Sequence, residues 1–294
     1  MISLSGTSIS DSHAHACPDI GPDCNDTSRP EPLPYRHELR IIPADLSATV
    51  AVGLRQNLGV EVYLPLRIIR SRIDFTTPTG APYDPASDGV SDLHHHNKTY
   101  ARISDPRLLL ILGHESADWG FSTRLGFTIP LGRTEENPFE LGGQGAEHQH
   151  FQWGTGVVSP VVGLGLNRFM GSVSISVTAL AQISAGRNNH GYKAGHIYNG
   201  AALARLISQP LGLSWQAGLS VYHETREDWS NSQVTGEGNL GRTDILASVH
   251  ISRALGPGAV NLSLSIPISL NTVGSQLSYP ALVGVSFSGA FVEN

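Results

Sequence analysis

Thirteen histidines stand out in a chain in which charged residues make up only 15% of the sequence. A His-x-His pair places two imidazoles on the same side of an extended chain, and imidazole nitrogens are good ligands for zinc and copper. The candidate metal ligands, most of them in expected loops, are His13, His15, His94, His96, His148 and His150. Copper or zinc is therefore the one cofactor that the sequence indicates. The alternative is that histidine serves here as a weakly charged polar loop residue.

Two cysteines, Cys17 and Cys24, lie close together in a segment rich in Pro, Asp and Gly. Two neighbouring cysteines in an exported loop more often form a disulfide than a metal site, so we predict a disulfide between them. In the reduced state they would instead add soft sulfur ligands for copper(I).

His114, Glu115 and Ser116 offer the residue types of a serine hydrolase, in which a histidine activates the serine. We expect this tripeptide in a short turn between two strands. No Asp or Asn partner is marked by spacing, so we predict that the chain is not an enzyme.

Four segments alternate between apolar and polar residues. In residues 172–184 the odd positions hold Val, Ile and Ala, while the even positions are mostly Ser and Thr. The same period of two, which is typical of β-strands, recurs in 119–130, 211–222 and 258–270. Weaker versions of the pattern cover residues 1–10, 37–54, 58–74, 97–113, 155–169, 196–208, 241–254 and 279–292.

The connections between these segments alternate in length. Short breaks fall near Gln56, Glu115, Met170, Gln209 and Pro257. Long polar stretches separate them, at 11–35, 75–97, 132–154, 185–195, 225–240 and 271–278. Tight periplasmic turns and longer outer loops produce this alternation in membrane barrels. The sequence thus predicts an all-β fold, an antiparallel up-and-down transmembrane β-barrel of about twelve strands. Residues 1–294 form its single domain, in which 1–35 supply an N-terminal strand and a long loop containing His and Cys.

A soluble sandwich or lipocalin-like barrel would also alternate, with its apolar face inward. The polar face decides between these folds, because it is dominated by Ser, Gly, Thr, Gln and Asn rather than by Lys and Glu, which suits a lumen better than an open surface. Tyr63, Trp153 and Tyr222 are among the aromatic residues near expected strand ends, a placement typical of interfacial girdles.

The composition excludes some partners and one kind of membrane anchor. No stretch of 18 apolar residues is present, which argues against a transmembrane helix. The net charge of −6 and the lack of a basic cluster argue against nucleic acid as a partner. The residues after Met1 lack the basic start and apolar core of a signal peptide, so export to the bacterial outer membrane is an expectation from the barrel alone.

Strand parity predicts which charged side chains line the lumen. The expected lining residues are Asp45, Glu61, Arg67, Arg107, Arg124 and His250. A mixture of signs on the wall would create a transverse field or an internal plug of salt bridges. We also expect the loop 132–154 to fold inward, with Gly142, Gly143 and Gly145 allowing the bend.

Three short motifs resemble an outer-membrane channel family named for its link to meta-cleavage phenol degradation. They are Ile103-Ser104-Asp105-Pro106, the strand end Gly126–Gly132 with its Pro-x-Gly turn, and Gln152–Gly156, which runs into the glycine-rich 159–165. The resemblance covers the chain from about residue 36 onward. The chain departs from the family pattern in having Ile103-Ser104 before Asp-Pro and in ending three residues after its last aromatic, Phe291. Membership would imply transport or passive permeation.

The function that we predict is a porin-like outer-membrane channel for small solutes, with the lipid bilayer and the solute as its partners. The first alternative is a barrel that binds copper or zinc through its outer-loop histidines. The second is a structural barrel that serves as a platform for other proteins.

Overall fold

A computed structural model describes residues 2–6, 9–15, 35–77, 79–84, 97–144, 148–208, 212–234, 238–272 and 278–289. The strands of the main sheet are β1 (Ile2–Gly6), β2 (Ile9–His15), β3 (Tyr35–Arg55), β4 (Leu58–Thr76), β5 (Lys98–Ile103), β6 (Arg107–Glu115), β7 (Trp119–Thr128), β8 (Pro160–Met170), β9 (Val173–Gln182), β11 (Ile197–Ser208), β12 (Leu213–Glu224), β14 (Arg242–Leu255), β15 (Gly258–Thr272) and β16 (Leu282–Gly289). A short helix, α1 (Pro138–Gly143), and a two-stranded ribbon of β10 (Tyr192–Lys193) and β13 (Asp228–Trp229) lie in the long connections.

The main sheet closes on itself. It contains fourteen described strands in the order β2-β3-β1-β16-β15-β14-β12-β11-β9-β8-β7-β6-β4-β5, and β3 also pairs with β4. β2 continues the line of β1 along β3, and β5 continues the line of β6 along β4. Among the described residues, twelve strands therefore surround the ring, and every pairing is antiparallel. The predicted twelve-stranded up-and-down barrel is confirmed.

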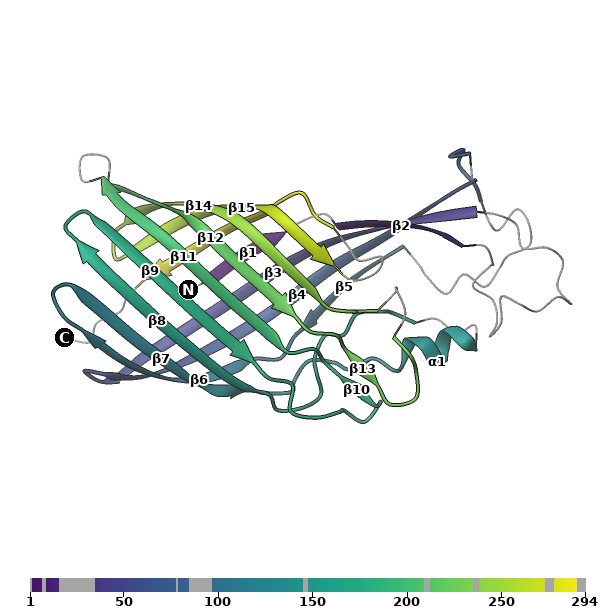
Figure 1. Cartoon of the computed structure of the whole chain (residues 1–294), viewed down its shortest axis with the longest axis horizontal. Helices are drawn as coiled ribbons and strands as arrows, with labels where there is room; N and C mark the ends of the chain where they lie inside the picture. Colours follow the sequence, from purple (N-terminus) through teal and green to yellow (C-terminus); the bar gives the residue numbers. More distant parts are fainter. Residues whose placement is uncertain are drawn as a thin grey trace, which may run out of the picture.

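The two ends of the barrel differ, as the lengths of the connections predict. Tight turns follow β3, β6, β8 and β14, and Gly171 and Gly256 take positive φ values of 63° and 58° there. The helix α1 and the β10–β13 ribbon gather at the opposite end, on the right in Figure 1. The long loops therefore form one mouth of the barrel.

The two faces of the wall have opposite polarity. In β8, Val162, Leu164 and Leu166 are 45%, 50% and 44% exposed, whereas the alternating Val161 and Gly163 are buried on the inner side. Large apolar side chains are exposed in the same way on other wall strands, including β12, β15 and β16. An apolar surface of this extent is unfavourable in water and favourable against lipid tails. The outer face of the wall is therefore a membrane-facing surface.

The structure corrects several predicted boundaries. The segment 97–113 is two strands, because Pro106 has no N–H for the ladder and Ser104 and Asp105 turn towards a loop. The strand expected at 155–169 begins only at Pro160. At the N-terminus the described strands are β1 and β2, and β2 ends at His15, beyond the predicted end at residue 10.

Small elements within the long loops were not predicted. The helix α1 lies in the loop 132–154, and β10 and β13 lie in 185–195 and 225–240. No helix in the described part of the chain has the length and apolarity needed to cross a membrane.

Candidate functional site

Two adjacent cavities lie inside the barrel. The larger has a volume of about 830 Å³ and is lined by the inner faces of β3, β4, β7, β8, β9, β11, β12 and β14, together with Phe151, Tyr279 and Leu282. The smaller, of about 500 Å³, lies under the long loops and is bounded by residues such as Gln152, Trp153 and Tyr192. The polar face of the alternating strands thus encloses space large enough for a small solute.

Six residues line both cavities, and we call them the junction. They are Asp45, Arg67, Leu180, Asn199, Tyr222 and Glu224. Five strands contribute to the set, namely β3, β4, β9, β11 and β12. The junction is therefore built by both halves of the wall rather than by one loop.

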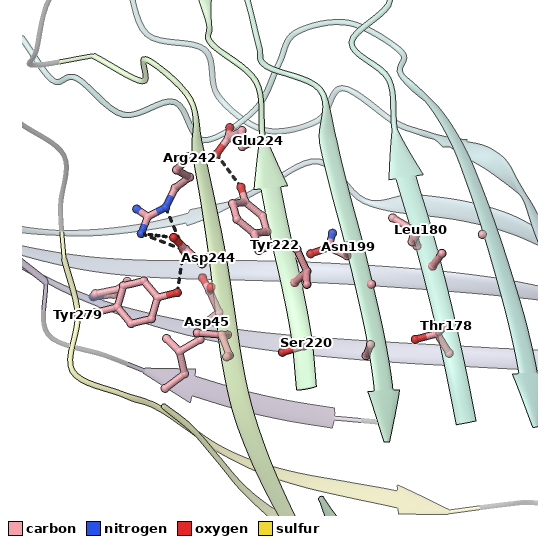
Figure 2. A pocket seen from close by; sticks show the side chains of 18 of the residues that line it. Asp45, Thr178, Leu180, Asn199, Ser220, Tyr222, Glu224, Arg242, Asp244 and Tyr279 are labelled. Carbon is pink, nitrogen blue, oxygen red and sulfur yellow. Dashed lines mark hydrogen bonds and ion pairs between the residues drawn. The ribbon is translucent and has the colours of Figure 1, made fainter. Parts of the chain in front are cut away.

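The charged groups at the junction are held by defined partners. Arg67 donates two hydrogen bonds to Asp45, from Nε to Oδ1 at 2.7 Å and from Nη2 to Oδ2 at 3.3 Å. Tyr222 Oη donates to Glu224 Oε2 at 2.6 Å (Figure 2). Bidentate Arg–carboxylate pairs fix both side chains in one geometry. The polar groups of the junction are therefore pre-positioned.

A second polar group lies on the wall of the larger cavity (Figure 2). Arg242 Nη2 lies 2.9 Å from Asp244 Oδ2, and Tyr279 Oη donates to the same oxygen at 2.8 Å. The Arg242 guanidinium also lies over the Tyr279 ring, 5.5 Å from its centroid. These contacts fasten the segment before β16 to β14.

The long loop 129–159 is fastened to the wall by Asp105. Its Oδ1 accepts a hydrogen bond from Gly132 N at 2.9 Å, and its Oδ2 accepts from Thr155 N at 2.7 Å and from Thr155 Oγ1 at 2.8 Å. Ser104 Oγ donates to the carbonyl of Trp153 beside it. The three motifs that carry the family resemblance therefore meet at one carboxylate.

Gly132 and Gly154 make this close approach possible. A Cβ on Gly154 would lie 2.5 Å from Asp105 Oδ1 and 2.6 Å from Gly132 O, and a Cβ on Gly132 would lie 2.7 Å from the Trp153 carbonyl oxygen. Only glycine fits without a shift of the backbone. Of the glycines predicted to bend this loop, Gly142 and Gly143 lie instead in the helix α1, so the prediction is wrong for them, and Gly145 lies outside the described residues.

The same loop buries an aromatic cluster against the wall. Trp153 is 2% exposed and packs on Ile41 and Ile69, together with Tyr100 and Phe151. The Phe151 and Trp153 rings meet edge to face, with centroids 5.3 Å apart. Aromatic packing thus holds part of the loop on the inner side of the wall, where Phe151 lines the larger cavity and Trp153 lines the smaller one.

A second apolar cluster joins the loops around the β10–β13 ribbon. Tyr192, Trp229 and Val234 are buried together, with Phe139 of α1 packed on them. Glu227 lies beside this cluster and accepts a hydrogen bond from Trp229 Nε1 at 3.3 Å. The pKa of Glu227 is raised to about 7, mainly by burial and in part by the nearby Glu224, against the opposing effects of Trp229, the Asn239 backbone and Arg226.

The structure places the six predicted lumen residues as follows. Asp45, Arg67 and Arg124 line the larger cavity, and Arg107 lines the smaller, where its guanidinium lies 4.2 Å from the Tyr63 ring centroid. Glu61 Oε2 lies 3.8 Å from Arg124 Nε. His250 shares the alternating face of β14 with the buried Asp244 and Ser248.

Sequence reasoning missed Tyr222, Glu224, Arg242, Asp244 and Tyr279. Two of them could have been predicted from the alternation of the strand. Arg242 and Asp244 occupy even positions of β14, as the predicted lumen residue His250 does. The sequence instead predicts Tyr222 in an interfacial girdle, and that prediction is wrong because its hydroxyl donates to Glu224 and its side chain lines both cavities. It is wrong also for Tyr63, which lines the smaller cavity, and for the buried Trp153.

The predicted metal ligands are only partly brought together. His148 Nε2 and His150 Nε2 lie 3.1 Å apart, and Phe139 packs edge to face on His150. His13 and His15 lie in β2 rather than in a loop, opposite His37 and Tyr35. The remaining candidates, His94, His96, Cys17 and Cys24, are outside the described residues. Within the described residues, no group of three or more His, Cys, Asp or Glu side chains is arranged to hold a metal.

Ser116 is not arranged as a nucleophile. It lies in the β6–β7 turn, where its hydroxyl donates to the Trp119 carbonyl at 3.1 Å and accepts from the Trp119 N–H at 3.2 Å. Its hydrogen bonds in the described structure thus go to the turn backbone and not to His114.

No family model and no curated protein matches the chain. Among solved structures, an outer-membrane channel from Pseudomonas putida F1 aligns with a TM-score of 0.55 at 10% sequence identity, over 98% of this chain and 94% of that one. A Pseudomonas aeruginosa FadL homologue aligns at 9% identity over 98% and 90% of the two chains, but its TM-score of 0.41 is too low to carry an argument. The predicted resemblance is confirmed at the level of the fold: this chain is an antiparallel β-barrel with the fold of an outer-membrane channel.

Proposed function

We propose that the chain lies in the bacterial outer membrane and that its lumen is a channel for small solutes. The observation that carries this proposal is the pair of adjacent cavities enclosed by the polar face of a wall whose other face is apolar. A barrel acting only as a platform for other proteins has no need of a hollow interior lined by paired charges. The paired charges also keep the lining wettable without a large net field.

Swelling of proteoliposomes tests this proposal. The purified chain is reconstituted, and swelling is followed in isosmotic solutions of neutral solutes of increasing size, with heat-denatured protein as the control. A channel predicts swelling that falls steeply as the solute grows. Swelling no faster than in the control, from a chain that still migrates as a folded barrel, would contradict the channel and favour the platform.

The contact between His148 and His150 favours a second function, and we propose that this pair binds copper or zinc at the loop mouth. Two imidazole nitrogens 3.1 Å apart suit two ligands of one ion with metal–nitrogen bonds of about 2.0–2.1 Å. Zinc and copper retention is measured after dialysis of the wild type and of His148→Gln. The control variant is His190→Gln, at an exposed loop histidine. Equal metal content in all three proteins would contradict this site.

A further inference from the structure

We propose that the junction is the selectivity filter of the channel, with Arg67 and Asp45 on one wall facing Tyr222 and Glu224 on the opposite wall. This inference rests on the proposed channel function and names the residues that decide which ions pass.

The strand order places the two halves of the junction across the full width of the barrel. From β4 to β12 the path through β3, β1, β16, β15 and β14 takes six steps, and the path through β6, β7, β8, β9 and β11 also takes six. Arg67 on β4 and Tyr222 on β12 are therefore on diametrically opposite strands. Even so, Arg67 and Asp45 line the same two cavities as Tyr222 and Glu224. Side chains from opposite walls thus border one space at the place where the two cavities meet.

Each side is fixed by its own hydrogen bonds. Asp45 holds Arg67 through two contacts, and Tyr222 donates to Glu224. The smaller polar and apolar residues between them, Asn199 and Leu180, complete the lining. Because both sides are held by partners on their own wall, a permeating ion passes between charged groups that keep their positions.

The charges at the junction predict the direction of selectivity. Among its six residues are two carboxylates and one guanidinium, so the formal charge is −1. Replacing Arg67 by Gln removes the positive charge and leaves two carboxylates, which favours cations. Replacing Asp45 by Asn and Glu224 by Gln leaves the guanidinium alone, which favours anions. The two changes therefore shift selectivity in opposite directions.

The test is the reversal potential of the reconstituted protein in a planar bilayer under a tenfold KCl gradient. We expect weak cation selectivity in the wild type, stronger cation selectivity in Arg67→Gln, and a reversal potential of opposite sign in the double variant Asp45→Asn, Glu224→Gln. Arg124→Gln is the matched control, because Arg124 lines the larger cavity but is not in the junction, and it should shift the potential less than Arg67→Gln does.

Tyr222→Ala is a second variant that does not depend on charge. We expect its single-channel conductance to rise about twofold or more, because the side chain lines both cavities and its removal would widen the space between them. Tyr279→Ala, which enlarges only the larger cavity, is its control. Folding of every variant is checked by heat-modifiable migration in a gel.

The outcomes separate this inference from the proposed function. Suppose that the wild type conducts and that the folded junction variants keep its reversal potential and conductance. This result would contradict the selectivity filter but would still support the channel. If neither the wild type nor any folded variant conducts, the channel itself fails and the filter fails with it.

Discussion

The Asp105 carboxylate and Thr155, fifty residues apart in the sequence, are joined by two hydrogen bonds, from Thr155 N at 2.7 Å and from Thr155 Oγ1 at 2.8 Å. Asp105 lies in the break between β5 and β6, and Thr155 lies in the long loop before β8. This contact joins the loop to the wall at the break between β5 and β6. It explains why the loop packs on the barrel instead of extending into the solvent.

Removing the Asp105 carboxylate should loosen the loop 129–159. In Asp105→Ala the amide groups of Gly132 and Thr155 lose their acceptor, and a hydrogen bond to a charged group contributes roughly 1.5–3 kcal/mol. We expect amide hydrogen exchange at these two residues to become about tenfold faster or more, since 1.4 kcal/mol is a factor of ten.

The control is Asp118→Ala, because Asp118 pairs with Arg168 at 3.2 Å at the short-turn end and is well exposed. Exchange in the loop 129–159 should stay at the wild-type rate in that variant. If amide exchange at Gly132 and Thr155 keeps its wild-type rate in Asp105→Ala, then the aromatic cluster alone holds the loop.

A methyl group at residue 154 should destabilise the protein by steric overlap. The Cβ of Gly154→Ala would lie 2.6 Å from the Gly132 carbonyl oxygen, which is backbone and cannot rotate away. Overpacking of this kind typically costs about 1–3 kcal/mol. The free energy of unfolding is measured in urea, with Gly53→Ala as the control because its Cβ would meet no atom within 4 Å. Equal losses in the two variants would contradict this account of the glycine.

The apolar cluster of Tyr192, Trp229 and Val234 in the long loops should lose stability as the pH rises. Burial raises the pKa of Glu227 to about 7 from an ordinary value of 4.5, so between these values the folded state binds more protons than the unfolded state. The stabilisation by protonated Glu227 is full below pH 4.5 and is lost as the pH rises through about 7, at a total of roughly 3 kcal/mol.

Glu227→Gln, which stays neutral, should remove this dependence. Hydrogen exchange around Tyr192 and Trp229 is compared between the wild type and the variant at the same pH, so that the intrinsic pH effect cancels. We expect faster exchange in the wild type at pH 8 and little difference at pH 5. No difference at either pH would refute the assignment to Glu227.

Much of the barrel is predictable from the sequence, because a wall with lipid on one side and a lumen on the other imposes a period of two on every strand. The segment 172–184 needs only this rule, and β9 covers Val173–Gln182 of it. The alternation of short and long connections follows from the topology alone. The order of the strands then follows from pairing each strand with its neighbour along the chain, and the ring closes between β1 and β16.

The junction was only half predictable for a physical reason. Asp45 and Arg67 carry charges in the middle of long alternating strands, where parity is strong. Tyr222 and Glu224 lie at the end of β12, where an aromatic residue is as typical of a lipid interface as of a lumen. The Asp105 anchor depends on three segments meeting in space, and no local pattern contains that contact.

The most direct test of the account is the accessibility of two adjacent positions on β12. Ser220 lines the larger cavity, and Leu219 is 50% exposed on the other face. Each is replaced by Cys in a background of Cys17→Ser and Cys24→Ser, and the proteins in liposomes are treated with a small water-soluble thiol reagent. We expect rapid labelling at residue 220 and almost none at residue 219. Labelling of residue 219 alone, or equal labelling of both, would contradict a water-filled lumen enclosed by a lipid-facing wall.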